Sequence, residues 1–363
     1  MLVCERRLAE LDRRRGDLRL HHHIRFLLDA GWDVSFLAFR RDADLRYARI
    51  LQQMGVNVTV GREHIEAVVR ETQPDVALTY MWFAGEQMLP WLRGRSPGAK
   101  VVVDTGDLDL LRRSRTCFRD ANAISAPGAS FGIDAARELN TYALADAVLA
   151  VSEKERRLID ELTGRPGLAS VVPLAEATPR SPVACPERRG VVFVGNFLHA
   201  PNVEAIEHFV TRVLPHLALN LLADHPVIVL GHGLTPEIRD LAADRSCIRM
   251  IGWVPDLTPY LHRARVVVVP LLTGAGVKGK LLQALSAGTP VVTTSVGIEG
   301  TAAVADRHVL VADDPAEFAD ALLRLLTDDG LWRRLSHAGH GAVRHHRPDI
   351  VRTLLLDTLS SLL

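Results

Sequence analysis

Short apolar runs recur along the chain and alternate with segments whose apolar residues fall on one helical face. The runs cover 2–4, 34–39, 56–60, 76–80, 101–103, 148–151 and 171–173, and then 191–194, 227–230, 248–251, 266–270, 291–294 and 309–311. Runs of this length predict buried strands, and their alternation with amphipathic helices predicts parallel sheets covered on both faces. The chain is therefore predicted to be an α/β protein of the doubly wound type.

A proline-rich segment divides this pattern in two. Pro179 to Glu187 contains three prolines between strand signals, which is the composition of a linker. A chain of 363 residues is long for one core. We therefore expect a first domain over 1–182, a second over 183–345, and a C-terminal segment, 346–363, whose helix packs across the domains.

The most informative stretch follows the strand that ends at Pro270. A glycine-rich turn, Gly274 to Gly276, leads into a helix that contains Lys278 and Lys280. Free backbone N–H groups at a helix N-terminus favour an anion, and lysines in a first turn oppose the helix dipole unless an anion is present. The stretch suits a diphosphate held without a metal, although a solvated basic turn before a packing helix gives the same pattern.

The first strand leads into a basic loop, Leu11 to Arg19, and then a helix that ends near Ala30. Because such loops lie at the carboxyl ends of strands, Gly16, Asp17 and Arg19 are site candidates beside the alternative of a solvated loop. The three histidines that follow, His21 to His23, point about 100° apart on a helix and cannot chelate one ion.

Other strand ends add candidates to the first half. Trp82 follows the strand 76–80 and can stack on a ligand or pack internally. Asp107-Leu108-Asp109 matches a short acidic string that many metal-dependent glycosyltransferases use, but it is common by chance, and the arginines after it can neutralise it. We take Asp107 as a substrate contact and predict no metal site. Ala121 to Gly132 is expected to be an acceptor loop.

Composition narrows the function classes. The 43 basic and 43 acidic residues balance, so nothing indicates a nucleic-acid surface. Four scattered cysteines without a CxxC pair argue against a disulfide framework and fit a reducing cytoplasm. No signal peptide and no apolar run of membrane-spanning length is found. A dinucleotide oxidoreductase is excluded because neither half opens with GxGxxG.

An ordered set of motifs in residues 190–345 resembles the glycosyltransferase family 4 group of retaining enzymes. The motifs are Val194-Gly195-Asn196 with Pro201-Asn202, Gly252 to Asp256, Gly276 to Ala284, Ala287 to Val292, and Gly297 to Gly300. The first half agrees more loosely, through Arg15 to Arg19 and Asp104 to Asp107. The resemblance implies a GT-B fold, in which two Rossmann-like domains face a cleft and the second binds the nucleotide sugar.

The resemblance also implies roles for single residues. Lys280, with Lys278 beside it, would hold the diphosphate, and Gln283 takes the place of the second glutamate of the family's E-x7-E motif. Ala275 stands where the first glutamate is expected, Asn196 where a basic residue is common, and Gly106 or Asp107 near the place of a cleft histidine. The remaining donor-binding positions are Gly16, His199, Asn202, Gly231, Trp253, Val254, Gly274, Gly276, Val277 and Glu299. Asp17, Arg19 and Trp82 are the acceptor-binding positions.

The expected activity is transfer of a sugar from a nucleoside diphosphate sugar to a small-molecule or glycan acceptor, with retained configuration. Lys278, Lys280 and the turn N–H groups would stabilise the leaving diphosphate, so no metal or cofactor is expected. Two alternatives stay open: a sugar-nucleotide 2-epimerase on the same fold, and a non-catalytic nucleotide-sugar-binding subunit, which the missing glutamates motivate.

Overall fold

The computed structural model describes residues 1–10, 15–41, 44–117, 128–181, 183–274 and 276–363. The chain forms two compact units. Unit 1 contains Met1–Ala175 and Pro348–Leu363, and unit 2 contains Glu176–Arg347. The division between the units falls after Ala175, whereas the sequence pattern predicted it after residue 182.

Unit 1 is built on a seven-stranded parallel sheet with the strand order β3-β2-β1-β4-β5-β6-β7. Its strands are β1 (Leu2–Glu5), β2 (Ser35–Ala38), β3 (Asn57–Val60), β4 (Val76–Tyr80), β5 (Lys100–Asp104), β6 (Ala147–Ala150) and β7 (Ala169–Val171). Its helices are α1 (Arg15–Asp29), α2 (Arg46–Gln53), α3 (Ile65–Thr72), α4 (Trp82–Arg95), α5 (Asp109–Cys117), α6 (Gly128–Leu144), α7 (Glu153–Thr163) and α16 (Pro348–Ser360), with a 3-10 turn at Arg62–His64.

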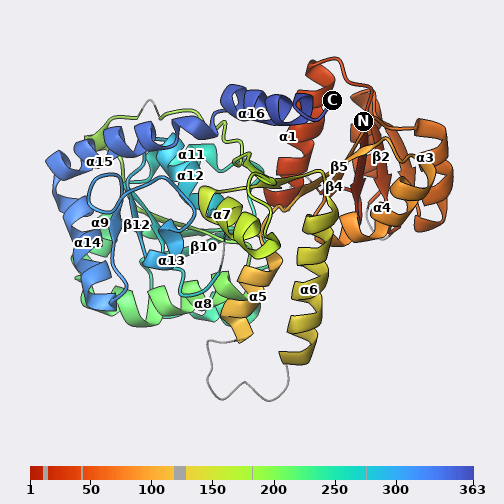
Figure 1. The fold of residues 1–363 in the computed structure, drawn as a ribbon. Coiled ribbons are helices and arrows are strands. Elements are labelled where there is room, and N and C mark those ends of the chain that lie inside the picture. Colours follow the sequence, from red (N-terminus) through yellow and green to blue (C-terminus); the bar gives the residue numbers. More distant parts are fainter. Residues whose placement is uncertain (11–14, 42–43, 118–127, 182, 275) are drawn as a thin grey trace. The chain divides into compact units, whose positions relative to one another are not determined.

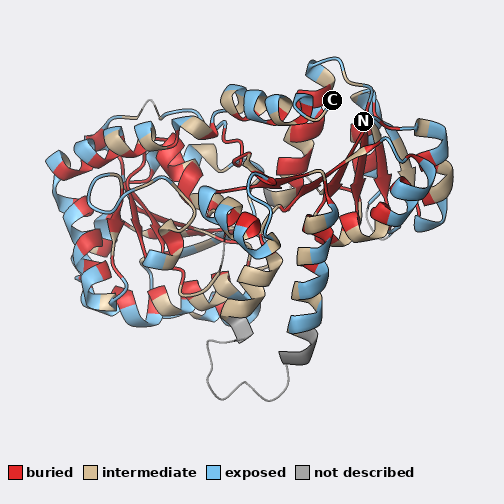
Figure 2. Cartoon of the chain, viewed as in Figure 1, coloured by how far each residue is buried: buried red, intermediate tan, exposed pale blue. Residues whose placement is uncertain are grey.

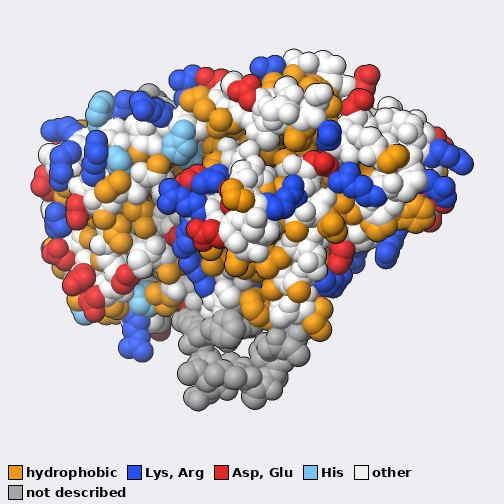
Figure 3. Space-filling model, viewed as in Figure 1, with side chains coloured by type: hydrophobic (Ala, Val, Ile, Leu, Met, Phe, Trp, Pro, Cys, Tyr) orange, Lys and Arg blue, Asp and Glu red, His pale blue; other side chains and the backbone are white. Residues whose placement is uncertain are grey.

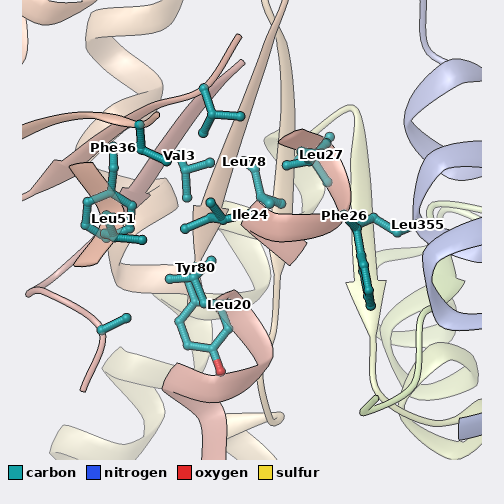
Figure 4. Packing of buried hydrophobic residues seen from close by; sticks show 14 of the residues in the cluster. Val3, Leu20, Ile24, Phe26, Leu27, Phe36, Leu51, Leu78, Tyr80 and Leu355 are labelled. Carbon is teal, nitrogen blue, oxygen red and sulfur yellow. The ribbon is translucent and has the colours of Figure 1, made fainter. Parts of the chain in front are cut away.

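Alternate residues of these strands face opposite cores, as strand geometry requires. Val3 and Leu78 pack in one cluster with α1, α2 and α16, whereas Leu2 and Ala77 pack in another with α3 and α4. Figure 2 shows the strands as the most continuously buried part of each unit, and Figure 4 shows part of the first cluster. Burial on both faces explains why the strands read as continuous apolar runs.

The last helix belongs to unit 1. Val351, Leu355 and Leu359 of α16 are fully buried in the same cluster as the α1 residues Leu20 and Ile24. The chain therefore returns to unit 1 after completing unit 2. The predicted packing of this helix across both domains is not described, because the structure defines each unit by itself.

Unit 2 is built on a six-stranded parallel sheet with the order β10-β9-β8-β11-β12-β13. Its strands are β8 (Val191–Val194), β9 (Val227–Leu230), β10 (Ile248–Gly252), β11 (Val266–Val269), β12 (Val291–Thr293) and β13 (Leu310–Val311). Its helices are α8 (Ala200–His208), α9 (Leu219–Asp224), α10 (Pro236–Asp240), α11 (Thr258–Arg263), α12 (Gly279–Ser286), α13 (Ser295–Ile298), α14 (Pro315–Thr327) and α15 (Asp329–Ala342). Shorter helical turns are Cys185–Glu187, Phe209–Val213, Leu214–His216 and Arg344–His346.

The two sheets, with helices covering the faces of each (Figure 1), confirm the predicted α/β, doubly wound class. Two local predictions were wrong. Helix α1 begins at Arg15, so Gly16, Asp17 and Arg19 are helical rather than loop residues; Asp17 in the first turn favours this early start. Residues 128–132 begin helix α6 instead of continuing an acceptor loop, and residues 121–127 of that loop lie outside the described residues.

The surface agrees with the balanced composition. On the face shown in Figure 3, basic and acidic side chains both occur among apolar and neutral ones. Among the described residues, no helix has the length and apolar character needed to cross a bilayer. Cys4, Cys185 and Cys247 carry free thiols.

Candidate functional site

In each sheet, the direction in which successive strands are added changes at one point. In doubly wound folds, ligands bind at that point, beside the carboxyl ends of the strands. In unit 2 the reversal lies between β8 and β11. The segments that leave these two strands are the Gly195–Asn202 segment and the Gly274–Lys280 turn. They contain most of the residues that the sequence singled out as donor-binding.

Lys280 and Asn202 join these two segments directly. The Lys280 ammonium donates a hydrogen bond of 2.6 Å to Asn202 Oδ1 and lies 5.2 Å from the centre of the Phe193 ring. Asn202 Nδ2 donates to the Asn196 carbonyl at 2.8 Å. Burial, and then the charge of Lys278, lower the pKa of Lys280 to about 7. An anion placed here would remove this penalty on the charged lysine.

Lys278 lies in the same turn and is itself only 8% exposed. Its ammonium donates a 2.6 Å hydrogen bond to the carbonyl of Gly276. Gly274 and Gly276 have φ values of 127° and 69°, which favour glycine. The turn therefore folds back on itself and holds Lys278 immediately before helix α12. Ala275 lies outside the described residues.

The loops after β8, β9 and β10 are interlocked. Gly231, with φ 138°, approaches so closely that a Cβ on it would lie 1.6 Å from the Gly195 carbonyl oxygen. Gly231 N–H donates to the Gly252 carbonyl, and Gly195 N–H donates to that of Leu230. Gly231 was a weak site candidate from the sequence. The structure explains this glycine by packing, because only glycine fits between these strand ends.

A second pair of loops supports the Gly274–Lys280 turn. An added Cβ on Gly300 would lie 3.1 Å from the Val277 side chain, so the segment after β12 packs on the turn. Thr273 Oγ1 donates a 2.7 Å hydrogen bond to Glu204 Oε2 of α8. Glu204 was missed because nothing in the sequence connects it with Thr273, 69 residues later.

Most of the other predicted donor residues belong to unit 2. His199 precedes α8 and is exposed; Trp253, after β10, is 53% exposed, and Val254 beside it is half-buried. Gln283 lies half-buried on α12, one turn after Lys280. Glu299 follows α13 and is half-buried next to Gly300. Gly16 belongs to unit 1.

In unit 1 the sheet reverses between β1 and β4. Beside this point, Arg19 of α1 forms a buried ion pair with Asp104 at the end of β5: its Nε lies 3.0 Å from both carboxylate oxygens. Arg19 Nη1 also donates to the Pro173 carbonyl, and His23 Nδ1 lies 3.1 Å from Asp104. Arg19 therefore links helix α1 to β5 instead of being a loop residue that faces an acceptor.

Two further carboxyl groups lie near the N-terminal end of α1. Glu5, which ends β1, accepts a hydrogen bond from Arg7 N–H, and Asp17 accepts one from Glu10 N–H. Burial raises the pKa of Glu5 to about 7 and that of Asp17 to about 6. Asp17 thus remains a site candidate, and Glu5 joins it. The sequence signal for Glu5 was its place as a polar residue at a strand end.

The predicted ligand stacking of Trp82 is wrong for a physical reason. Its side chain is 6% exposed and packs with Val103 and Tyr142. The Arg137 guanidinium covers the ring at 5.2 Å from its centre, and the Phe83 ring meets it edge-on. The ring faces are therefore occupied by the protein itself.

The acidic string after β5 is neutralised by the next helical turn. Asp107 Oδ2 lies 3.0 Å from Arg112 Nε, and Asp109 also pairs with Arg112 and with Arg113. This arrangement fits the alternative of arginine neutralisation. In the described part of the chain, no group of three or more histidine, cysteine or acidic side chains is arranged to hold a metal ion.

Comparisons with known proteins indicate which chemistry the carboxyl edge of the unit 2 sheet could support. The sequence model described as "Glycosyl transferases group 1" matches residues 188–328. A D-inositol 3-phosphate glycosyltransferase of Xylanimonas cellulosilytica is 27% identical over 337 residues, which cover 82% of this chain and 75% of the relative. A phosphatidyl-myo-inositol mannosyltransferase of Mycobacterium leprae is 30% identical over 142 residues, which cover 37% of each chain.

Solved structures resemble the whole chain. Sucrose-phosphate synthase from Thermosynechococcus elongatus superposes with a TM-score of 0.76 at 15% identity, over 99% of this chain and 98% of that one. Anabaena HepE, solved in complex with UDP, superposes with a TM-score of 0.76 at 14% identity, over 99% of both chains. At such low identity this likeness concerns the fold.

Proposed function

The chain belongs to the group 1 glycosyltransferases and has their GT-B fold of two Rossmann-like units, and from this premise we propose that it moves a sugar from a nucleoside diphosphate sugar to an acceptor hydroxyl. The predicted family, fold and enzyme class are thereby confirmed. The choice of donor, the retained configuration and the independence from metal are parts of the proposal.

The observation that carries the proposal is the Lys280–Asn202 contact at the reversal point of unit 2. Lys280 is a cation held by a neutral partner, so its charge is not cancelled by an acid in that contact. Its lowered pKa and the neighbouring Lys278 indicate that positive charge is gathered in a partly buried place. A diphosphate supplies the opposite charge.

The reaction follows from this placement. The bond between C1 of the sugar and the diphosphate oxygen breaks, and a bond between C1 and the acceptor oxygen forms. As negative charge grows on the diphosphate, Lys278, Lys280 and the N–H groups of the turn stabilise it. A diphosphate oxygen takes the acceptor proton on the same face of the sugar, which retains the configuration. The two lysines supply the positive charge, so the proposal includes no metal.

The comparisons support a choice of substrates to test first. HepE is solved with UDP and with UDP-glucose, which supports a uridine diphosphate donor. The names of the Xylanimonas and Mycobacterium relatives contain a phosphorylated inositol, D-inositol 3-phosphate in one and phosphatidyl-myo-inositol in the other, which supports a hydroxyl of a cyclic polyol as the acceptor group.

Calorimetric titration with UDP, GDP, ADP and TDP, first in EDTA and then with magnesium, tests the site. We expect one nucleotide to bind in EDTA with a micromolar dissociation constant. Lys280→Ala should weaken that binding about 10- to 100-fold, as expected for loss of a charge-assisted contact, and should lower transfer from the matching sugar nucleotide further. Lys154→Ala, which removes an exposed lysine from α7 in unit 1, is the matched control.

Normal binding and turnover in Lys280→Ala would overturn the diphosphate assignment. Binding that appears only with magnesium would overturn the metal-free arrangement. Conversion of the donor to an epimer without an acceptor would replace transfer by epimerisation as the reaction.

A further inference from the structure

The carboxylate of Glu204 lies beside the glycine-rich turn but takes no part in the proposed reaction. Glu204 is half-buried in helix α8, close after Asn202, and its Oε2 accepts a 2.7 Å hydrogen bond from the Thr273 hydroxyl. Thr273 immediately precedes Gly274, where the turn begins. Hydrogen bonds to a carboxylate are charge-assisted and are among the stronger ones in proteins. The contact is thus a firm link between α8 and the start of the turn.

Helix α8 holds the turn at both of its ends. At the start, Glu204 accepts the hydrogen bond from Thr273, and at the end Asn202 accepts the 2.6 Å hydrogen bond from the Lys280 ammonium. Glu204 and Asn202 are near neighbours in the helix, whereas the residues that they bind enclose the whole turn. One short helical segment therefore sets the spacing between the two ends.

The turn between these contacts has a backbone that needs such support. Gly274 and Gly276 have φ values of 127° and 69°. Glycine reaches this region without strain, but it also loses more conformational entropy on ordering than any other residue. A turn that became ordered only when a ligand binds would lose affinity by that amount, whereas contacts that order it beforehand remove the loss.

The Glu204 contact is separate from those that hold the rest of the turn. In the middle, a Cβ on Gly300 would lie 3.1 Å from the Val277 side chain, so the segment after β12 packs there. At the end, Lys280 is held by Asn202. Loss of the Glu204 contact should therefore loosen the start of the turn while Lys280 stays in place.

A purely structural role for this hydrogen bond has different consequences. A bond that only joined α8 to the segment after β11 would stabilise unit 2 as a whole, so its loss would affect every part of the nucleotide site alike. A bond that orders the turn acts on the diphosphate, because the backbone N–H groups of the turn favour an anion. The nucleoside part of the donor carries no such charge.

We propose that Glu204 is a positioning residue of the donor site: through Thr273 it fixes the start of the Gly274–Lys280 turn, so that the N–H groups of the turn are ordered before a diphosphate binds. This inference rests on the proposed binding of a nucleoside diphosphate sugar by this turn. It adds a carboxylate that acts through the backbone and does not itself touch the substrate.

The test compares UDP with uridine, which lacks both phosphates, by calorimetry for UDP and saturation-transfer NMR titration for uridine, using the full chain. Glu204→Ala and Thr273→Val should each weaken UDP binding about 3- to 10-fold, the effect of losing one hydrogen bond that orders a loop, and change uridine affinity less than about twofold. Glu204→Gln keeps an acceptor oxygen and should retain UDP affinity within about twofold. Glu207→Ala, which removes an exposed glutamate from the same helix, is the matched control and should bind both probes normally.

The double variant shows whether both residues act through one contact. Glu204→Ala combined with Thr273→Val should weaken UDP no more than either single variant, because both changes remove the same hydrogen bond. Additive losses, equal losses for UDP and uridine, or normal UDP affinity in Thr273→Val would each overturn the positioning role. If Glu204→Ala does not fold, Thr273→Val decides between these outcomes.

Lys280→Ala in the same titrations separates this inference from the proposed function. If Lys280→Ala weakens UDP binding while the Glu204 and Thr273 variants bind normally, the diphosphate site stands and the positioning role falls. If wild-type protein does not bind UDP, or Lys280→Ala binds it normally, the proposed function falls and the positioning role falls with it.

Discussion

The ammonium group of Lys280 donates a 2.6 Å hydrogen bond to the side-chain oxygen of Asn202, 78 residues earlier in the chain. The choice of partner matters. An aspartate at 202 would neutralise Lys280, whereas the amide orients the lysine and leaves its charge available to a ligand. The asparagine also fixes the loop after β8 through the Asn196 carbonyl.

Asn202→Asp tests this division of roles. The new carboxylate should pair with Lys280, raise its pKa and repel the diphosphate. We expect UDP affinity to fall about tenfold or more while thermal stability is kept. Asn202→Ala is the comparison, because it removes the contact without adding charge and should weaken UDP less. Unchanged UDP affinity in Asn202→Asp would separate Lys280 from the diphosphate.

UDP binding should be accompanied by the uptake of a proton by Lys280. With a pKa of about 7, Lys280 is mostly neutral at pH 8 in the free protein. A bound diphosphate favours the charged form, so UDP binding at pH 8 should consume up to about one proton, and affinity should fall by up to about tenfold per pH unit above 7. Calorimetry in two buffers of different ionisation enthalpy measures the uptake.

The matched variant for this measurement is Lys280→Met, which should abolish the uptake together with most of the binding. Equal apparent enthalpies in the two buffers with wild-type protein would show that Lys280 does not change its protonation, contrary to this prediction.

Gly231→Ala should destabilise unit 2. A methyl group there would meet the Gly195 carbonyl oxygen and would require an unfavourable backbone conformation at φ 138°. We expect a loss of at least about 3 kcal/mol, the sum of backbone strain and a steric clash. Gly341→Ala, in α15 with open space around it, should leave stability equal or raise it by up to about 1 kcal/mol. Thermal unfolding of both variants checks this, and equal melting temperatures would refute it.

Asp104→Asn should destabilise unit 1 by about 3–5 kcal/mol, because it leaves the buried Arg19 charge without its partner. Adding Arg19→Met in the same chain should recover part of this loss. Denaturant unfolding of the single and double variants measures the difference. A double variant less stable than Asp104→Asn would contradict this account.

The same pair predicts a pH dependence. Burial raises the pKa of Asp104, but Arg19 and His23 outweigh it and lower the pKa to about 2. Because the folded pKa lies below the unfolded value, the stabilisation is present above about pH 4 and is lost as the pH falls toward 2. Asp104→Asn should therefore show a flatter stability profile between pH 4 and 2 than wild-type protein. Parallel profiles would exclude Asp104 as the titrating group.

The two sheets could be predicted from the sequence because burial on both faces makes each strand a continuous apolar run, as at Val266–Val269. It also located the Gly274–Lys280 turn, where glycines and lysines lie close together in the chain. It could not supply the Lys280–Asn202 contact, which depends on how two strand ends meet. The prediction for Trp82 was wrong in another way. Its place after a strand indicated contact with a ligand, but in the folded protein Arg137 and Phe83 pack against its ring.

The return of α16 to unit 1 makes unit 2 an insertion within unit 1 rather than its successor. Residues 176–347 form one uninterrupted piece of chain, whereas a fragment ending at Ala175 lacks the apolar cover that Val351, Leu355 and Leu359 provide. A synthetic peptide of residues 348–363 should therefore complement that fragment in trans, and tags or fusions at the C-terminus act on the amino-terminal half of the molecule.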